Sequence, residues 1–62
     1  MFISKETIKR LEEAMNNDPS TIISLTLISE IVETPTGLDI VSGEDCYYLS
    51  NNGNLYHIGR VA

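Results

Sequence analysis

Residues 46–60 read CYYLSNNGNLYHIGR, and this stretch decides how the chain folds. Asn52 and Gly53 lie between two runs that are rich in aromatic and aliphatic residues. An Asn-Gly pair is the strongest short signal for a β-hairpin, because a type I′ turn needs a positive φ at both central positions. Asn tolerates that conformation and Gly adopts it freely. The stretch therefore predicts a hairpin with a two-residue turn at Asn52-Gly53.

Such a turn fixes which side chains share a face of the hairpin. It pairs Leu49 with Tyr56 and Tyr48 with His57, and cross-strand partners lie on the same face. The face predicted to point to the core is uniformly apolar or aromatic: Tyr47, Leu49, Tyr56 and Ile58. The opposite face is mixed and is predicted to meet solvent or a partner: Cys46, Tyr48, Ser50, Leu55 and His57. A longer loop would shift the pairing and exchange the neighbours.

Upstream of the hairpin, residues 4–16 are predicted to form a helix. Ser4 is suited to the N-cap, because its hydroxyl can accept a hydrogen bond from a backbone N–H of the first turn. Apolar residues recur at helical spacing in one narrow stripe: Ile8, Leu11, Ala14 and Met15. Pro19 follows shortly after, and the residue before a proline avoids the α region. The helix is therefore expected to end near Asn16.

Residues 20–33 read STIISLTLISEIVE and allow two interpretations. Seven of the 13 residues from 21 to 33 are β-branched, which favours a strand. The alternative is a helix with Asp18 as its N-cap and Pro19 as its first residue. A single strand of this length is expected to contain a bulge or bend near Leu27-Ile28.

The remaining segments complete a predicted α+β fold. Residues 34–37 (TPTG) and 42–45 (SGED) have the composition of turns, and residues 38–42 are a short predicted strand between them. The predicted architecture is one N-terminal helix packed on a four-stranded antiparallel meander. We expect residues 1–62 to form one small domain.

Size and charge limit the possible partners. The chain has 62 residues and a net charge of −5, from nine acidic and four basic residues. A domain of this size buries only about 60% of its unfolded surface, so association with itself, as a homo-oligomer, or with another protein is expected. The negative charge disfavours direct binding to nucleic acid. No apolar stretch is long enough for a signal peptide or a membrane span, and a single Cys fits a reducing compartment, so a cytoplasmic location is predicted.

No residue pattern predicts catalysis. His57 is the only histidine, and no nucleophile motif, metal-ligand spacing or phosphate-binding loop accompanies it. Cys46 follows two acidic residues, whereas nucleophilic cysteines occur in electropositive surroundings. We therefore expect a protein that is not an enzyme and uses no metal or cofactor.

Apolar residues remain on the second face of the predicted sheet after one helix has covered the first. An exposed surface of aliphatic and aromatic groups is typical of a contact site. The residues predicted to bind a protein partner are Ile22, Ile28, Val32, Tyr48, Leu55 and His57. The predicted function is a protein-protein interaction module that uses an exposed sheet face or edge. The alternative is a small acidic inhibitor, of the type that mobile elements encode, that binds a basic groove of a nucleic-acid-processing protein.

Overall fold

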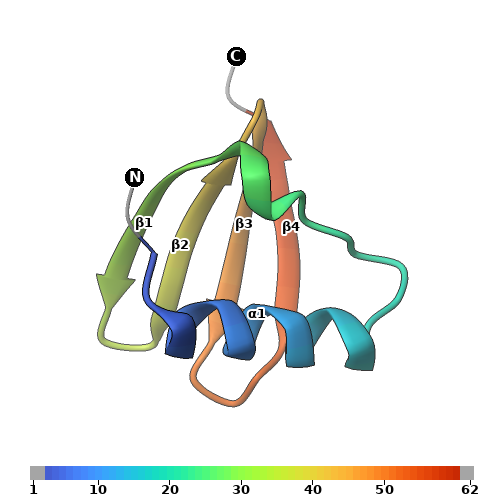
Figure 1. Cartoon of the computed structure of the whole chain (residues 1–62), viewed down its shortest axis with the longest axis vertical. Helices are drawn as coiled ribbons and strands as arrows, with labels where there is room; N and C mark the ends of the chain where they lie inside the picture. The colour runs from blue at the N-terminus through green and yellow to red at the C-terminus, as the bar shows by residue number, and fades with distance from the viewer. Residues whose placement is uncertain (1–2, 61–62) are drawn as a thin grey trace.

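The computed structural model describes residues 3–60. Its elements, in chain order, are α1 (Lys5–Asn17), a short 3₁₀ helix η1 (Leu25–Leu27), β1 (Ile28–Thr34), β2 (Gly37–Ser42), β3 (Asp45–Ser50) and β4 (Leu55–Arg60). The strands form one antiparallel sheet in the order β1-β2-β3-β4, and α1 runs across one of its faces (Figure 1). The predicted fold class, a helix followed by a four-stranded antiparallel meander, is confirmed.

Helix α1 begins and packs as its sequence predicts. The hydroxyl of Ser4 accepts a hydrogen bond from the backbone N–H of Thr7 at 3.2 Å, so Ser4 is the N-cap. Leu11 and Ala14 are buried against the sheet, and Met15 is half-buried beside them. The apolar stripe of the helix is therefore the part that joins the core.

Asp18 ends the helix and organises the turn that follows. Its backbone N–H donates to the carbonyl of Ala14 at 3.0 Å. Its carboxylate accepts hydrogen bonds from the hydroxyl and backbone N–H of Ser20 and from the hydroxyl of Thr21. These bonds, led by the one from the Ser20 hydroxyl, lower the pKa of the Asp18 carboxyl.

Residues 20–33 form neither of the two predicted elements over their whole length. The strand begins only at Ile28, which faces Ser42, the last residue of β2. Residues before Ile28 have no strand beside them, so they cannot extend the sheet. The strand interpretation is therefore wrong for residues 20–27. The helix interpretation is wrong for the whole segment apart from the single 3₁₀ turn of η1. A register irregularity between Ile28 and Glu30 lies close to the predicted bulge.

Residues 20–27 instead cross the same face of the sheet as α1, over the part that α1 does not cover. The carbonyl of Ser24 accepts a hydrogen bond from the Ser42 hydroxyl at 2.9 Å, and the Gly43 N–H donates to the Leu27 carbonyl at 3.0 Å. Ile23 is buried in the core. This segment covers the end of the sheet next to the β2–β3 turn, while α1 covers the opposite end (Figure 1).

The β3–β4 hairpin has a longer loop than predicted. Ser50 donates its N–H to the Asn54 carbonyl at 2.9 Å, so Ser50 faces Asn54 and residues 51–53 form the loop. Gly53 has a φ of 88°, and among the described residues only glycines have a positive φ. Asn52 therefore does not adopt the left-handed conformation that a type I′ turn requires, and the loop is the three-residue kind with a left-handed glycine.

Contacts with the neighbouring turn explain this loop. Asn51 donates its backbone N–H to the carbonyl of Thr36 at 2.9 Å and its side-chain amide to the carbonyl of Pro35 at 3.2 Å. These two hydrogen bonds tie the β3–β4 loop to the β1–β2 turn. They stabilise the three-residue loop, although the Asn52-Gly53 pair by itself favours a two-residue turn.

The longer loop shifts the hairpin register by one residue. Leu49 faces Leu55, and Tyr48 faces Tyr56. Leu55 is 5% exposed, whereas Tyr56 and Ile58 are 52% and 62% exposed. The prediction that Tyr56 and Ile58 point to the core is therefore wrong, while Tyr47 and Leu49 are buried as predicted. A second irregularity leaves Ile58 without a facing residue on β3, because His57 faces Tyr47 and Gly59 faces Cys46.

The core lies entirely between the sheet and the elements on the α1 side. Its buried apolar members are Leu11, Ala14, Ile23, Ile28, Leu38, Ile40, Tyr47, Leu49 and Leu55. No element within residues 3–60 covers the other side of the sheet (Figure 1). We call that side the outer face.

Candidate functional site

The six residues predicted to bind a partner do not lie on one surface. Ile28 and Leu55 are buried in the core, at 8% and 5% exposure. Val32 and Tyr48 lie on the outer face, opposite the core residues of their strands. Ile22 and His57 lie on the α1 side, where they line a small hollow with Tyr47. The expectation of one shared exposed face is wrong, because it assumed a strand through Ile22 and a two-residue hairpin turn.

Strand pairing arranges the outer face in lateral rows. Its side chains belong to Glu30, Val32, Thr34, Asp39, Val41, Cys46, Tyr48, Ser50 and Tyr56. One row runs through directly facing residues of all four strands: Val32, Asp39, Tyr48 and Tyr56. The next row contains Glu30, Val41 and Cys46. Aromatic, aliphatic and acidic groups therefore lie side by side on this face.

A pair of tyrosines is the main feature of the outer face. The ring centroids of Tyr48 and Tyr56 are 6.4 Å apart, and the ring planes are inclined by 26°. The Tyr48 hydroxyl is hydrogen-bonded to the hydroxyl of Thr36, and it lies only 2.9 Å from where a Cβ on Gly37 would be. Tyr48 is thus held in place over the glycine at the start of β2. Tyr56 is more exposed, at 52%.

The outer face carries negative charge and no Lys or Arg side chain. Asp39 faces Tyr48 directly across the β2–β3 pair, and both Asp39 and Glu30 are exposed. Lys5, Lys9 and Arg10 are on α1, at the opposite side of the sheet. The chain's fourth base is at the end of β4, where it forms an ion pair with the β2–β3 turn. This face is therefore suited to a positively charged partner.

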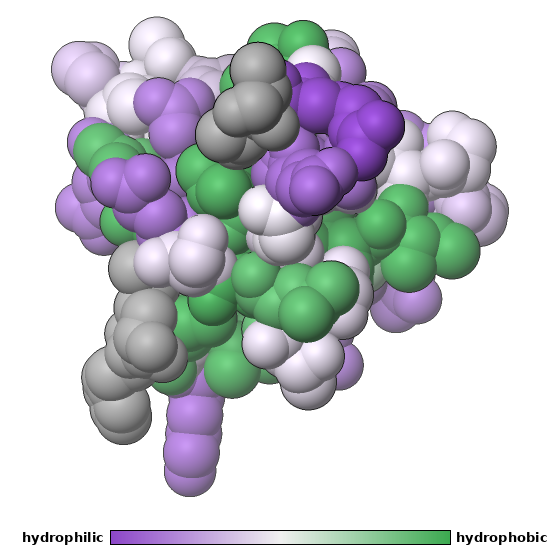
Figure 2. All heavy atoms as spheres, turned by 90° about the horizontal axis from the view of Figure 1, so that it is seen from above, coloured by the Kyte–Doolittle hydropathy of each residue, from purple (hydrophilic) through white to green (hydrophobic). Residues whose placement is uncertain are grey.

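Three other large apolar side chains are also exposed. Ile22 in the segment before η1, Leu27 in η1 and Ile58 on β4 are 74%, 59% and 62% exposed. Seen from above, the surface of the molecule has hydrophobic side chains gathered beside a group of hydrophilic ones (Figure 2).

Polar contacts join the end of β4 to the β2–β3 turn. His57 Nε2 lies 3.1 Å from Asp45 Oδ1, and Arg60 contacts Glu44 at 2.5 Å and Asp45 at 3.8 Å. The His57 ring also lies against Tyr47, with centroids 5.0 Å apart. Burial, and to a smaller degree the charge of Asp45, raise the pKa of Tyr47. These contacts account for the position of His57, which is held between Asp45 and the ring of Tyr47.

His57 does not have the contacts of a catalytic base. The hydroxyls of Ser20 and Thr21 line the same hollow of about 140 Å³. Both hydroxyls donate to Asp18, and neither forms a hydrogen bond with His57. A nucleophile that is activated by a histidine lies within hydrogen-bond reach of it. Within residues 3–60, no group of three His, Cys, Asp or Glu side chains is placed to hold a metal ion.

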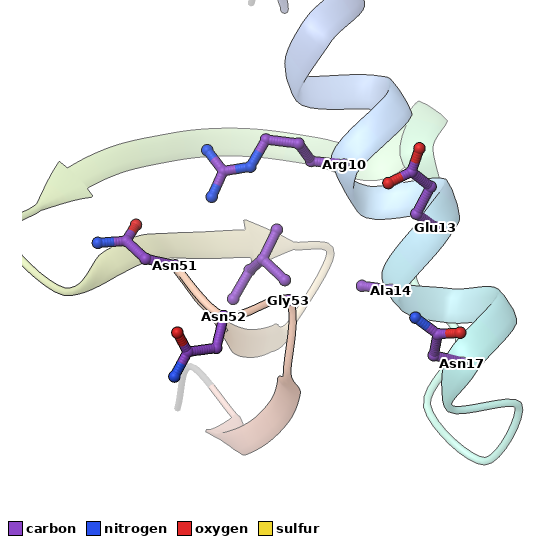
Figure 3. Close-up of a pocket in the computed structure, with 8 residues that line it drawn as sticks. Arg10, Glu13, Ala14, Asn17, Asn51, Asn52 and Gly53 are labelled. Atoms are coloured by element: carbon purple, nitrogen blue, oxygen red, sulfur yellow. The ribbon is translucent and has the colours of Figure 1, made fainter.

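A polar groove, which the sequence did not predict, lies between α1 and the β3–β4 loop. It has a volume of about 260 Å³, and Figure 3 shows its lining. Arg10 reaches from α1 toward the sheet, while Asn51 and Asn52 on the loop point away from α1. Glu13 also lines the groove, so both signs of charge are present at its rim. The loop that forms one wall depends on the hairpin register, which explains why this groove could not be foreseen.

No helix in the described part of the chain is long and apolar enough to cross a membrane.

Comparisons with known proteins do not assign the chain to a family. The chain matches no protein-family model, and the comparisons with curated proteins and with solved structures found no similar protein.

Proposed function

We propose that the protein is a non-enzymatic interaction module that binds a basic surface of another protein with its outer face. The observation that carries this proposal is the pair of half-buried Tyr48 and exposed Tyr56 beside Asp39, on a side of the sheet that no described element covers. Tyrosine is enriched in protein contact surfaces, because it supplies a large amphipathic area and loses little conformational entropy.

The face is a better binding surface than either edge of the sheet. β1 has a register irregularity at Ile28/Glu30 and carries Glu30 and Glu33. β4 has its irregularity at Ile58. Bulges and charged side chains on edge strands are the features that hinder the addition of another strand. Both edges are therefore protected against strand addition, whereas the outer face has no such barrier.

Charge favours a different protein over a second copy of this chain. The protein has a net charge of −5, and its outer face contains Glu30 and Asp39 without a Lys or Arg. Two copies that met through this face would bring these carboxylates together, and like charges at an interface are unfavourable. A partner with basic groups would pair with them and would approach faster by electrostatic steering. The self-association that was predicted from chain length is therefore not part of this proposal.

The alternative of an acidic inhibitor is a more specific form of the same idea. It would need carboxylates arranged to follow a basic groove. The nine acidic residues are instead scattered: Glu6, Glu12 and Glu13 on α1, Asp18 at its end, Glu30 and Asp39 on the outer face, Glu33 on the other face of β1, and Glu44 and Asp45 at the β2–β3 turn. No row of evenly spaced acids exists among the described residues, so the proposal does not include a nucleic-acid-processing partner.

Affinity capture with surface variants would test the proposal. Tagged wild-type protein, the double variant Asp39→Asn/Tyr56→Ser and the control Ile22→Ser would be incubated with the same cell lysate. Ile22 is exposed on the α1 side of the sheet, so the control removes an apolar group from a different surface. We expect wild type and control to capture the same basic protein and the double variant to lose it. Higher salt should weaken capture, since exposed charge pairs are screened.

Two results would contradict the proposal. One is a partner that the double variant retains at the wild-type level, because binding would then use another surface. The other is a stable homodimer that Tyr56→Ser dissociates, because the outer face would then be covered by a second copy. Circular dichroism of each variant would show that the fold is intact.

A further inference from the structure

We infer that the outer face contains a subsite for an arginine side chain, formed by the rings of Tyr48 and Tyr56 and the carboxylate of Asp39. The inference rests on the proposed function and names the chemistry of the partner: an arginine-bearing segment of a basic protein. In one lateral row of the outer face, Asp39 faces Tyr48 and Tyr48 faces Tyr56. Neighbouring strands are about 4.8 Å apart, so the row spans about 10 Å. One long side chain can contact all three groups.

The tyrosine rings supply the stacking surface. Tyr48 is fixed by the bond between its hydroxyl and that of Thr36 and by the glycine beneath it. A cation interacts favourably with an aromatic ring within about 6 Å of the ring centroid. The two centroids are 6.4 Å apart, so one guanidinium can lie within that range of both rings. The fixed Tyr48 ring means that little side-chain freedom is lost when the cation binds.

The carboxylate of Asp39 supplies the charge and selects the shape of the cation. Asp39 is exposed and takes part in none of the ion pairs of the described chain. A carboxylate accepts two parallel N–H bonds from a planar guanidinium, which can stack on a ring at the same time. A lysine ammonium is compact and strongly hydrated, and it has no plane to stack. The subsite should therefore prefer arginine to lysine.

Two short probe peptides of equal charge would test this preference. The peptides acetyl-GRGRG-amide and acetyl-GKGKG-amide would be titrated into ¹⁵N-labelled protein at low salt, and the shifts of backbone amides would be followed by NMR. We expect the arginine peptide to bind about 3- to 10-fold more tightly, with the largest shifts at Asp39, Tyr48 and Tyr56. Tyr56→Leu keeps much of the apolar area but removes a ring, and Asp39→Asn removes the charge. Each should reduce the preference, while Ile22→Ser should leave it unchanged.

The outcomes separate this inference from the proposed function. Equal affinity for the two peptides would overturn the inference, because the face would then act only through its negative charge. Shifts centred on Glu44 and Asp45 or on α1 would also overturn it. In either case, the proposed function would still be supported if a basic protein were captured and if its capture required Asp39 and Tyr56. An arginine preference combined with no captured partner would support the subsite and count against the proposed function.

Discussion

Replacing Leu55 by alanine is expected to cost far more stability than replacing its neighbour Tyr56. The Leu55 side chain is 5% exposed and lies opposite Leu49 in the core, whereas Tyr56 is 52% exposed. Truncating a buried leucine to alanine costs about 2–5 kcal/mol. A substitution at an exposed strand position costs about 1 kcal/mol or less. A two-residue turn at Asn52-Gly53 would reverse this order, because it would bury Tyr56 in place of Leu55.

The expected loss is large for a protein of this size. A core of fewer than about 70 residues rarely supplies more than about 3–5 kcal/mol. A loss of about 3 kcal/mol lowers the ratio of folded to unfolded protein by more than about 100-fold. Urea denaturation followed by far-UV circular dichroism would measure the effect. If Leu55→Ala does not fold, Leu55→Met gives a graded test, since a volume-conserving change costs less than about 1.5 kcal/mol.

One result would refute the reasoning. If Tyr56→Ala cost as much as Leu55→Ala or more, Tyr56 would be the core residue and the hairpin would have the shorter loop. The tyrosine pair of the outer face would then not exist, and both proposals that depend on it would fail.

Three further predictions test other parts of the fold. Gly37→Ala is expected to destabilise the protein by about 1–3 kcal/mol or more, because a Cβ at this position would lie 2.1 Å from the backbone oxygen of Leu49. A thermal midpoint equal to that of wild type would contradict this close approach. Ser4→Ala should cost about 1 kcal/mol in urea denaturation, since it removes the cap of α1, and Ser4→Asp should restore most of the loss. Burial and the charge of Asp45 raise the pKa of Tyr47 above 10.0, so the folded state holds this proton more tightly than the unfolded state does. The contribution of this pKa shift to the free energy of unfolding should therefore be fully present below about pH 10. It should be lost as the pH rises through the raised pKa of Tyr47. Urea midpoints that fall equally for wild type and Tyr47→Phe in this range would contradict the assignment.

Local sequence chemistry was sufficient where the structure depends on near neighbours. The Ser4 cap and the stripe around Leu11 lie within one helix, and both are confirmed. The turn at residues 42–45 is also confirmed: Ser42 faces Asp45, and Gly43 takes a φ of 61° at the first turn position. Turns of this kind place glycine where a positive φ is needed.

Sequence reasoning failed where distant residues decide the conformation. Asn51 makes its two hydrogen bonds to Pro35 and Thr36, which no pattern within residues 46–60 could reveal. Those bonds favour the three-residue loop over the local signal of Asn52-Gly53. The resulting shift of one residue moved Tyr56 from the predicted core to the outer face, beside Tyr48. Tyr48 was therefore predicted on the outer face, but its partner Tyr56 was not.

The residues before Ile28 show a second reason for failure. Their β-branched composition favours an extended conformation, but a strand also needs a partner. β2 ends at Ser42, opposite Ile28, so the sheet offers no pairing to residues 20–27. These residues instead place Ile23 in the core, and Ile22 is exposed on the α1 side of the sheet. Ile22 therefore became separated from Val32 and Tyr48, with which it was predicted to form one surface.

Site-specific photo-crosslinking would test the central claim most directly. A photoreactive phenylalanine analogue would replace Tyr56 in one sample and Ile22 in another, and cells that produce each protein would be irradiated. We expect the probe at position 56 to form a covalent adduct with a basic protein through an arginine-containing segment, and the probe at position 22 to form none. An adduct with the same protein from position 22 alone would contradict the claim that the outer face is the binding surface.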